Sequence, residues 1–314
     1  MYISSRIVRK DITQQKAPGV ARASRRERIL GYLALTKPRI IELLLVTTLP
    51  TMFVAKRGIP SVLLMVETLV GGALAAGGAN AINMIVDRDI DSVMYRTRNR
   101  PLVTGVLNQS QAWVFAICLE VAAFVELSVL VNLLSASLAI GATLFYVFIY
   151  TIWLKRTSTQ NIVIGGAAGA VPVLVGWAAV TGRVTLAPFV LFAIIFLWTP
   201  PHFWALAVKY SEDYKAAKVP MLPAVRSLSV TARQIMIYTL ALLACSLLFI
   251  KVGHMGYFYS VSALVLGIVF VVYAARLMHE STEKRAMQTF HYSITYLTLL
   301  FVAMGVDVVI RYYV

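Results

Sequence analysis

The chain has 314 residues, of which 59% are hydrophobic and only 14% are charged, and its mean hydropathy is +0.77. Soluble domains carry about one-quarter charged residues, so the composition excludes a water-soluble globular protein. The formal net charge of +15 does not indicate nucleic-acid binding, because the basic residues stand between apolar runs of membrane-spanning length and therefore report topology.

The N-terminal segment, residues 1–34, is a basic tail with few large apolar side chains. Such a composition favours disorder and attraction to anionic lipid, so we expect a disordered cytoplasmic tail in contact with membrane lipid, not with nucleic acid. Residues 35–314 are expected to form one transmembrane domain.

Apolar windows of about twenty residues predict nine membrane-spanning helices. The break between the third and the fourth, near Asn132, is the weakest of these predictions, and without it the later spans would invert. The nine are expected at 38–55, 61–86, 111–131, 133–154, 162–181, 186–208, 233–251, 257–277 and 291–312.

Charge supports the nine-span interpretation. With the N-terminus inside, twenty-four of the 29 Lys and Arg residues fall on the inner side, as the positive-inside rule requires. We therefore predict an all-α, polytopic protein of the cell membrane, with the N-terminus cytoplasmic, the C-terminus outside, and the helices around a central cavity open to the cytoplasmic side.

The second span runs directly into a cluster of acids and amides. At about 100° per residue, Asn80, Asn83, Asp87 and Asp91 fall within an arc of roughly 80°, whereas Asp89 points the opposite way. Carboxylates crowded on one helix face repel one another unless a cation lies between them. Mg²⁺ fits this sparse oxygen set, because it completes its coordination with water and substrate phosphates.

Three polar segments are predicted at the inner ends of spans, where they can close over one mouth. The first adds a cationic cluster after the acids, the second follows the sixth span, and the third ends the fourth span. Cations and tyrosine hydroxyls around a diphosphate would stabilise departing negative charge. The segments contain Tyr95, Arg96, Arg98 and Arg100; residues 209–223; and Tyr146, Tyr150, Lys155 and Arg156.

The acid and arginine pattern resembles the first aspartate motif of the UbiA-type intramembrane prenyltransferases, and further segments look like the haem-directed branch of that family. The first motif reads Asn83-x3-Asp87-x3-Asp91, followed by Arg96-Thr97-x2-Arg100-Pro101-Leu102. The others are Thr36-Lys37-Pro38-Arg39, Tyr150-x3-Leu154-Lys155-Arg156-Thr157-x3-Asn161-Ile162-x2-Gly165, Trp198-Thr199-Pro200-Pro201-His202-Phe203-Trp204-Ala205-Leu206 and Asp213-Tyr214-x2-Ala217-x2-Pro220-Met221-Leu222-Pro223.

The resemblance implies transfer of a farnesyl group from farnesyl diphosphate to a vinyl group of haem b, with water addition, giving haem O. It implies Mg²⁺ on Asn83, Asp87, Asp91 and Asp213, with Lys155 also catalytic. It further implies proximity to haem A synthase or to haem-copper oxidase assembly. Diphosphate binding is implied for Arg39, Arg96, Arg100, Tyr150, Arg156 and Tyr214, and haem contact for His202.

One position departs from the family pattern. The second aspartate motif is often DxxxD, but the residue four after Asp213 is Ala217, which puts a second protein-held magnesium ion in doubt. Three other functions stay open: prenylation of an aromatic quinone precursor, polytopic transport, and electron transfer through b-type haem. The intramembrane acids Glu120, Glu126 and Asp307 have no assigned role in this interpretation.

Overall fold

The structure, a computed structural model, describes residues 23–313, without the side chains at positions 39, 40, 43–45 and 313. The described residues form helices joined by turns and no strand, which confirms the all-α prediction. The elements, of which η1 and η2 are π-helical, are α1 (Arg25–Thr36), α2 (Pro38–Lys56), α3 (Val62–Val86), α4 (Arg88–Val93), α5 (Gln109–Glu126), η1 (Leu127–Val131), α6 (Leu133–Leu144), η2 (Phe145–Leu154), α7 (Lys155–Thr157), α8 (Asn161–Thr181), α9 (Leu186–Lys209), α10 (Ser211–Ala216), α11 (Leu222–Val225), α12 (Leu228–Val252), α13 (Tyr257–His279) and α14 (Glu283–Tyr313).

Within the described range, eight continuous helices are long and apolar enough to cross a membrane, so the chain is a multi-pass membrane protein. They are α3, α5 with η1, α6 with η2 and α7, α8, α9, α12, α13 and α14. The first expected span coincides with α2, a helix of 19 residues whose side chains are described only in part. The total of nine spans therefore stays a prediction.

The break predicted near Asn132 is confirmed, because the helices on either side are separate candidate spans. Asn132 itself is extended, and its side-chain oxygen accepts a hydrogen bond from the Ser135 N–H at 2.8 Å, which caps α6. Its amide nitrogen donates to the Ala178 carbonyl at 2.9 Å and so ties this turn to the end of α8. One side chain thus ends one span and begins the next.

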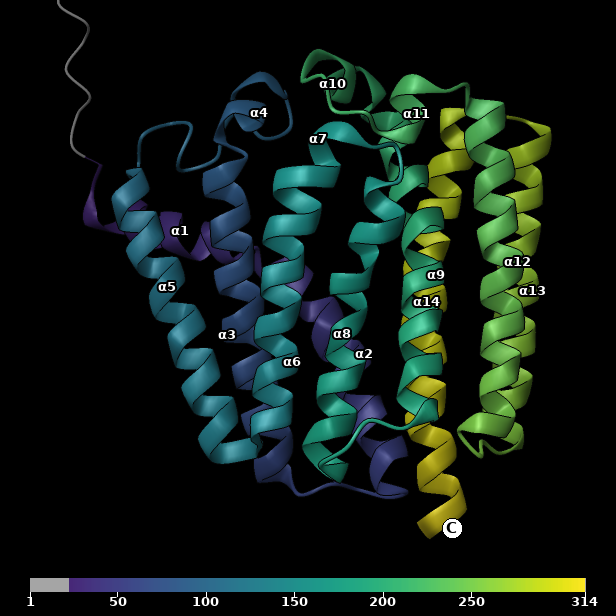
Figure 1. Ribbon diagram of the computed structural model, residues 1–314. Coiled ribbons are helices and arrows are strands. Elements are labelled where there is room, and N and C mark those ends of the chain that lie inside the picture. Colours follow the sequence, from purple (N-terminus) through teal and green to yellow (C-terminus); the bar gives the residue numbers. More distant parts are fainter. Residues whose placement is uncertain (1–22, 314) are drawn as a thin grey trace, which may run out of the picture.

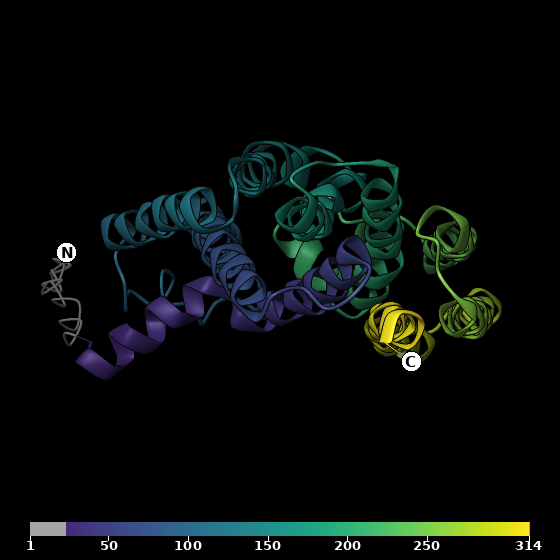
Figure 2. The same cartoon turned by 90° about the horizontal axis from the view of Figure 1, so that it is seen from below.

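The bundle has two unlike ends (Figure 1). We call the end that carries α4 and α10 the polar end. The turn that leads from α5 to α6 and the C-terminus lie at the opposite end (Figure 1). Seen along the helices, α12 and α13 lie at one side of the molecule, next to α9 and α14 (Figure 2).

Residues 25–34 differ from the expected disordered tail, because the structure shows them in helix α1. Ser24 caps this helix: its hydroxyl accepts from the Glu27 N–H, and the Glu27 carboxylate accepts from the Ser24 N–H. Gly31 and Leu35 are buried on its inner face. The helix lies across the bundle rather than along it (Figure 1). Residues 1–22 of the expected tail lie outside the described residues.

Small residues allow close packing of the helices in this bundle. On α3, a Cβ at Gly78 would overlap the Glu120 side chain of α5, so Glu120 would have to shift if that position were not glycine. On α8, Gly165 and Gly166 play the same part toward Tyr150 and Thr199. The central helices α8 and α9 are buried over most of their length. They therefore form a rigid support for the polar end.

Asp307, which had no assigned role, caps another helix. This buried carboxylate on α14 accepts hydrogen bonds from the Gly256 N–H at 2.6 Å and the Tyr259 N–H at 3.1 Å. Both donors lie at the N-terminus of α13, where backbone N–H groups lack partners within the helix. One turn later, Arg311 donates to the His254 carbonyl. Asp307 therefore fastens the α12–α13 turn to α14.

Replacing Asp307 by alanine should lower the free energy of unfolding by about 1–3 kcal/mol, because two buried N–H groups lose their acceptors. Denaturant unfolding of the detergent-purified protein measures this change. The matched control is Val306→Ala, at the exposed neighbouring position, which should change stability by less than about 0.5 kcal/mol. Equal stability of the two variants would show that Asp307 is not a structural cap.

Candidate active site

The acid stripe crosses the junction of α3 and α4. Asp87 ends α3 and precedes α4, with φ −86° and ψ 8°. The four-residue hydrogen-bond spacing nevertheless continues: the Asp87 N–H donates to the Asn83 carbonyl at 2.9 Å, and the Asp91 N–H donates to the Asp87 carbonyl at 2.8 Å. Asn83, Asp87 and Asp91 are buried, whereas the Asp89 side chain is 64% exposed. The helix period therefore separates the two faces as expected.

Each of the buried side chains Asn83, Asp87 and Asp91 contacts a basic side chain from elsewhere in the chain. Lys155 forms an ion pair with Asp87, and the Arg100 guanidinium lies 2.6 Å from the Asp91 carboxylate. The Lys37 ammonium donates to the Asn83 side-chain oxygen at 2.8 Å. Protein cations therefore relieve part of the repulsion that the sequence argument assigned to a metal ion, and the metal site stays a prediction.

A divalent cation still fits the donor set. The described residues contain no group of three acids, histidines or cysteines close enough to share a metal ion. Mg²⁺, however, needs few protein ligands and takes the rest from water and phosphate. Asp87 Oδ1 is buried without a hydrogen-bond partner among the described residues, and its nearest ion-pair contact is the Arg156 guanidinium at 3.8 Å. An unsatisfied buried carboxylate oxygen is a suitable metal ligand.

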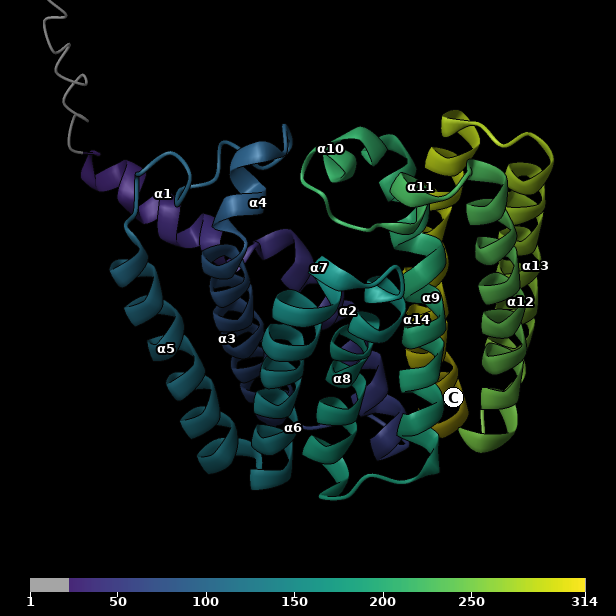
Figure 3. The same cartoon turned by 45° about the horizontal axis from the view of Figure 1, so that its top comes forward.

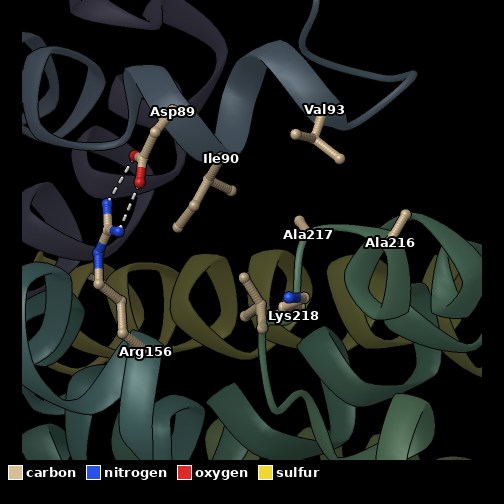
Figure 4. A pocket seen from close by; sticks show the side chains of 8 residues that line it. Asp89, Ile90, Val93, Arg156, Ala216, Ala217 and Lys218 are labelled. Carbon is tan, nitrogen blue, oxygen red and sulfur yellow. Dashed lines mark hydrogen bonds and ion pairs between the residues drawn. The ribbon is translucent and has the colours of Figure 1, made fainter.

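Asp89 holds a different arginine on the outer face of the junction. Its two carboxylate oxygens accept from the Arg156 guanidinium at 2.7 and 2.8 Å, and Arg156 also donates to the Val86 carbonyl at 3.1 Å. Hydrogen bonding to Arg156 lowers the pKa of the Asp89 carboxyl to about 2. The pair borders a pocket of about 390 Å³ between α4 and the loop after α10 (Figure 4). Arg156 therefore contacts Asp89 on the outer face and also lies 3.8 Å from Asp87.

The segment around α10 and the α4 segment both lie at the polar end (Figure 3). Asp213 Oδ2 accepts the Arg96 backbone N–H at 3.2 Å, although these residues are 117 positions apart. The Arg96 guanidinium lies over the Tyr210 ring, 5.2 Å from its centroid. Burial raises the pKa of Tyr214, while Arg96 and Arg100 nearby oppose that effect. The structure thus brings the first and second polar segments together.

The third polar segment lies on the π-helix η2 and the short helix α7 that follows it. Tyr146 and Tyr150 stack with ring centroids 5.3 Å apart, and the helix leads directly into Lys155 and Arg156. π-helical turns are rare and occur frequently at functional sites. The Tyr150 ring packs against Gly165 of α8, where any larger residue would overlap it. Tyr150 and Lys155 therefore reach the site from a single helix.

His202 is buried among aromatic rings of the bundle. Its ring stacks on Trp198, with centroids 4.3 Å apart, and lies 4.8 Å from that of Phe290. Its Nδ1 lies 2.8 Å from the Ser293 hydroxyl. These contacts hold the imidazole between α9 and α14.

Two residues of the site were missed by sequence reasoning. Lys37 lies in a segment that only its resemblance to the family connects with the site, and its left-handed backbone, with φ 51°, is not predictable from the sequence. Burial, together with Arg100 and Lys155 nearby, lowers the pKa of Lys37 to about 7. The second is Thr151, a buried threonine in an apolar span, which carries no sequence signal. The side chain of Arg39 lies outside the described residues.

Comparison with known proteins decides the family. The model of the UbiA prenyltransferase family matches residues 44–302. The chain belongs to the UbiA prenyltransferase family. This UbiA prenyltransferase is 51% identical over 310 residues to a protein of Clavibacter michiganensis named "Protoheme IX farnesyltransferase", covering 97% of both chains. A protein of the same name from Pseudarthrobacter chlorophenolicus is 52% identical over 300 residues, covering 94% of this chain and 92% of that one.

Solved structures support the same fold. A digeranylgeranylglyceryl phosphate synthase structure superposes with a TM-score of 0.75 at 18% identity, covering 90% of this UbiA prenyltransferase and 99% of that chain. A UbiA homologue from Aeropyrum pernix gives 0.66 at 18% identity, covering 85% and 97%. One from Archaeoglobus fulgidus, bound to GPP and Mg²⁺, gives 0.59 at 16% identity, covering 88% and 99%. At these identities the likeness concerns the fold alone.

Proposed function

We propose that this UbiA prenyltransferase transfers a farnesyl group from farnesyl diphosphate to a vinyl group of haem b, with addition of water, giving haem O. The observation that carries the proposal is the identity of about 51% to relatives named protoheme IX farnesyltransferase over 97% of both chains. The cation-rich acid stripe supplies the chemistry that ionisation of an allylic diphosphate requires. We assign the metal site to Asn83, Asp87 and Asp91, with Asp213 approaching from the α10 side.

The reaction balances without a protein nucleophile. The C–O bond to the diphosphate breaks with its electron pair on the leaving group, and the farnesyl cation is attacked by the vinyl carbon. Water then captures the new cation beside the porphyrin and releases a proton. Mg²⁺, when bound by the stripe, would neutralise charge on the leaving diphosphate.

The basic side chains would bind the diphosphate as its charge develops. Lys155 and Arg100 form ion pairs with Asp87 and Asp91, and Arg156 lies 3.8 Å from Asp87. Arg96 approaches from the α10 side, where its backbone N–H binds Asp213. We add Lys37 to this set because it contacts Asn83 directly. Arg39 stays a proposed member on the basis of sequence alone. The hydroxyls of Tyr150 and Tyr214 would line the mouth, and the protein walls would keep water from the cation.

His202 is the proposed haem contact. Since its Nδ1 is engaged by Ser293, the other ring nitrogen is the atom that would meet the iron or a propionate. The rings of Trp198 and Phe290 fix the plane of the imidazole.

We also propose that the polar end faces the cytoplasm. The positive-inside rule places most basic residues there, and the C-terminus at the opposite end would lie outside. Haem O made at this membrane would pass to an enzyme of haem A synthesis or to assembly of a haem-copper oxidase.

The mass of the product tests the proposal. Purified protein supplied with haem b, Mg²⁺ and radiolabelled farnesyl diphosphate should release diphosphate and form a labelled haem whose mass exceeds that of haem b by one farnesyl group plus one hydroxyl group. A labelled quinone precursor formed from an aromatic acceptor, with haem b left unchanged, would contradict the assignment of the acceptor. Absence of magnesium-dependent diphosphate release from the haem mixture would favour a transporter instead.

A further inference from the structure

Thr151 lies beneath the acid stripe and contacts it directly. Its side chain is fully buried in η2. The hydroxyl donates its hydrogen to the Tyr146 carbonyl at 2.9 Å. It accepts a hydrogen bond from the Asn83 side-chain nitrogen at 3.1 Å, across 68 positions of sequence. Thr151 is therefore an acceptor toward Asn83, because its only hydrogen is already engaged.

The π-helical turn is what directs this hydroxyl. Threonines in the regular helices of this chain, such as Thr199 and Thr239, donate to the carbonyl four residues earlier. Thr151 donates to the carbonyl five residues earlier, in keeping with the wider π-helical turn. In an α-helix its partner would be the Val147 carbonyl, and the oxygen lone pair would point elsewhere. The π-helical turn thus orients the Thr151 hydroxyl so that it can accept the hydrogen bond from Asn83.

The contacts with Asp87 and Thr151 decide which end of the Asn83 amide faces the site. Its nitrogen donates to Asp87 Oδ2 at 2.7 Å and to Thr151, which uses both amide hydrogens. The side-chain oxygen is then left to face Lys37. In the reversed amide, the oxygen would oppose the Asp87 carboxylate and the Thr151 lone pairs. Thr151 and Asp87 together exclude that orientation.

We propose that Thr151 is a positioning residue that keeps the Asn83 side-chain oxygen, rather than the nitrogen, on the side of Lys37, where the proposed metal and diphosphate would bind. The proposal rests on the proposed function only in taking Asn83 as a metal ligand. Without the hydroxyl, the amide loses one of its two acceptors and can rotate, so the oxygen faces the metal for only part of the time. A single hydrogen bond of this kind corresponds to about a tenfold change in affinity.

The test compares Thr151→Val with Thr151→Ser by titrating purified protein with Mn²⁺ in the presence of inorganic pyrophosphate, monitored by electron paramagnetic resonance. We expect the Mn²⁺ dissociation constant to rise about tenfold in Thr151→Val, and to stay within about twofold of the unsubstituted chain in Thr151→Ser. Thr239→Val, a buried threonine of α12, is the matched control and should leave binding unchanged. Thr151→Ala removes the hydroxyl in a second way if the valine variant does not fold.

Two outcomes would overturn the proposal. Unchanged Mn²⁺ binding in both Thr151→Val and Thr151→Ala would show that the hydroxyl does not position Asn83. Equal weakening in Thr151→Ser and Thr151→Val would assign the effect to packing of the methyl group. Failure of the proposed function would give a different result. The unsubstituted chain would then make no haem O, but Thr151→Val would still bind Mn²⁺ more weakly than Thr151→Ser and the unsubstituted chain.

Discussion

Asp87→Asn is expected to lower the turnover rate by about 10³-fold while the protein still inserts into the membrane. Asparagine keeps the shape of the buried side chain but removes its charge, so Lys155 loses its ion-pair partner and the metal site loses a carboxylate. Product formation by the purified variant, normalised to the amount recovered from membranes, measures the effect.

The control for Asp87→Asn lies two residues away. Asp89→Asn alters an acid of the same junction that is 64% exposed and contacts Arg156 on the outer face. Exposed ion pairs contribute little, so this variant should lose only a few-fold in rate. If the two variants lose activity equally, the acid stripe is not the site of chemistry, and turnover by Asp87→Asn at the unsubstituted rate would remove Asp87 from the mechanism.

Gly165→Ala is expected to lower the turnover rate by about 100-fold, because misplacing a catalytic group by about 1 Å costs that much. A Cβ at this position would overlap the Tyr150 ring, so the ring and the π-helix η2, which leads into Lys155, must shift. The rate of farnesyl transfer at saturating substrate, together with the thermal midpoint, measures the effect and separates it from unfolding.

Gly169→Ala, one turn further along α8, is the matched control. A Cβ there meets no atom within 4 Å, so the same substitution in the same helix should leave the rate unchanged. Equal rates in the two variants would show that the position of Tyr150 does not matter for the reaction.

Hydropathy and the helix period were enough to predict much of the fold. The turn at Asn132 could be predicted because the positive-inside rule needs it, and the structure confirms it. The separation of buried Asp87 from exposed Asp89 follows from the helix period alone. Both features depend on neighbours in sequence, which is why sequence reasoning found them.

Features that depend on distant partners were not predictable. Nothing local shows that Lys37 contacts Asn83, or that the Asp307 carboxylate caps a helix 51 positions earlier. The π-helical turn that directs Thr151 is equally invisible to an apolar pattern. The ion pairs of the acid stripe were not predictable either, because the sequence places Arg100 and Lys155 near one mouth but does not show that they contact Asp91 and Asp87.

Binding of Mn²⁺ in place of Mg²⁺ is the most direct test of the central claim, that the stripe of Asn83, Asp87 and Asp91 holds a divalent cation with a diphosphate. With pyrophosphate present, the paramagnetic resonance spectrum of the purified protein should show bound Mn²⁺, and the bound signal should vanish in the Asp87→Asn, Asp91→Asn double variant. No bound Mn²⁺ in the unsubstituted chain, or the same binding in the double variant, would contradict the account.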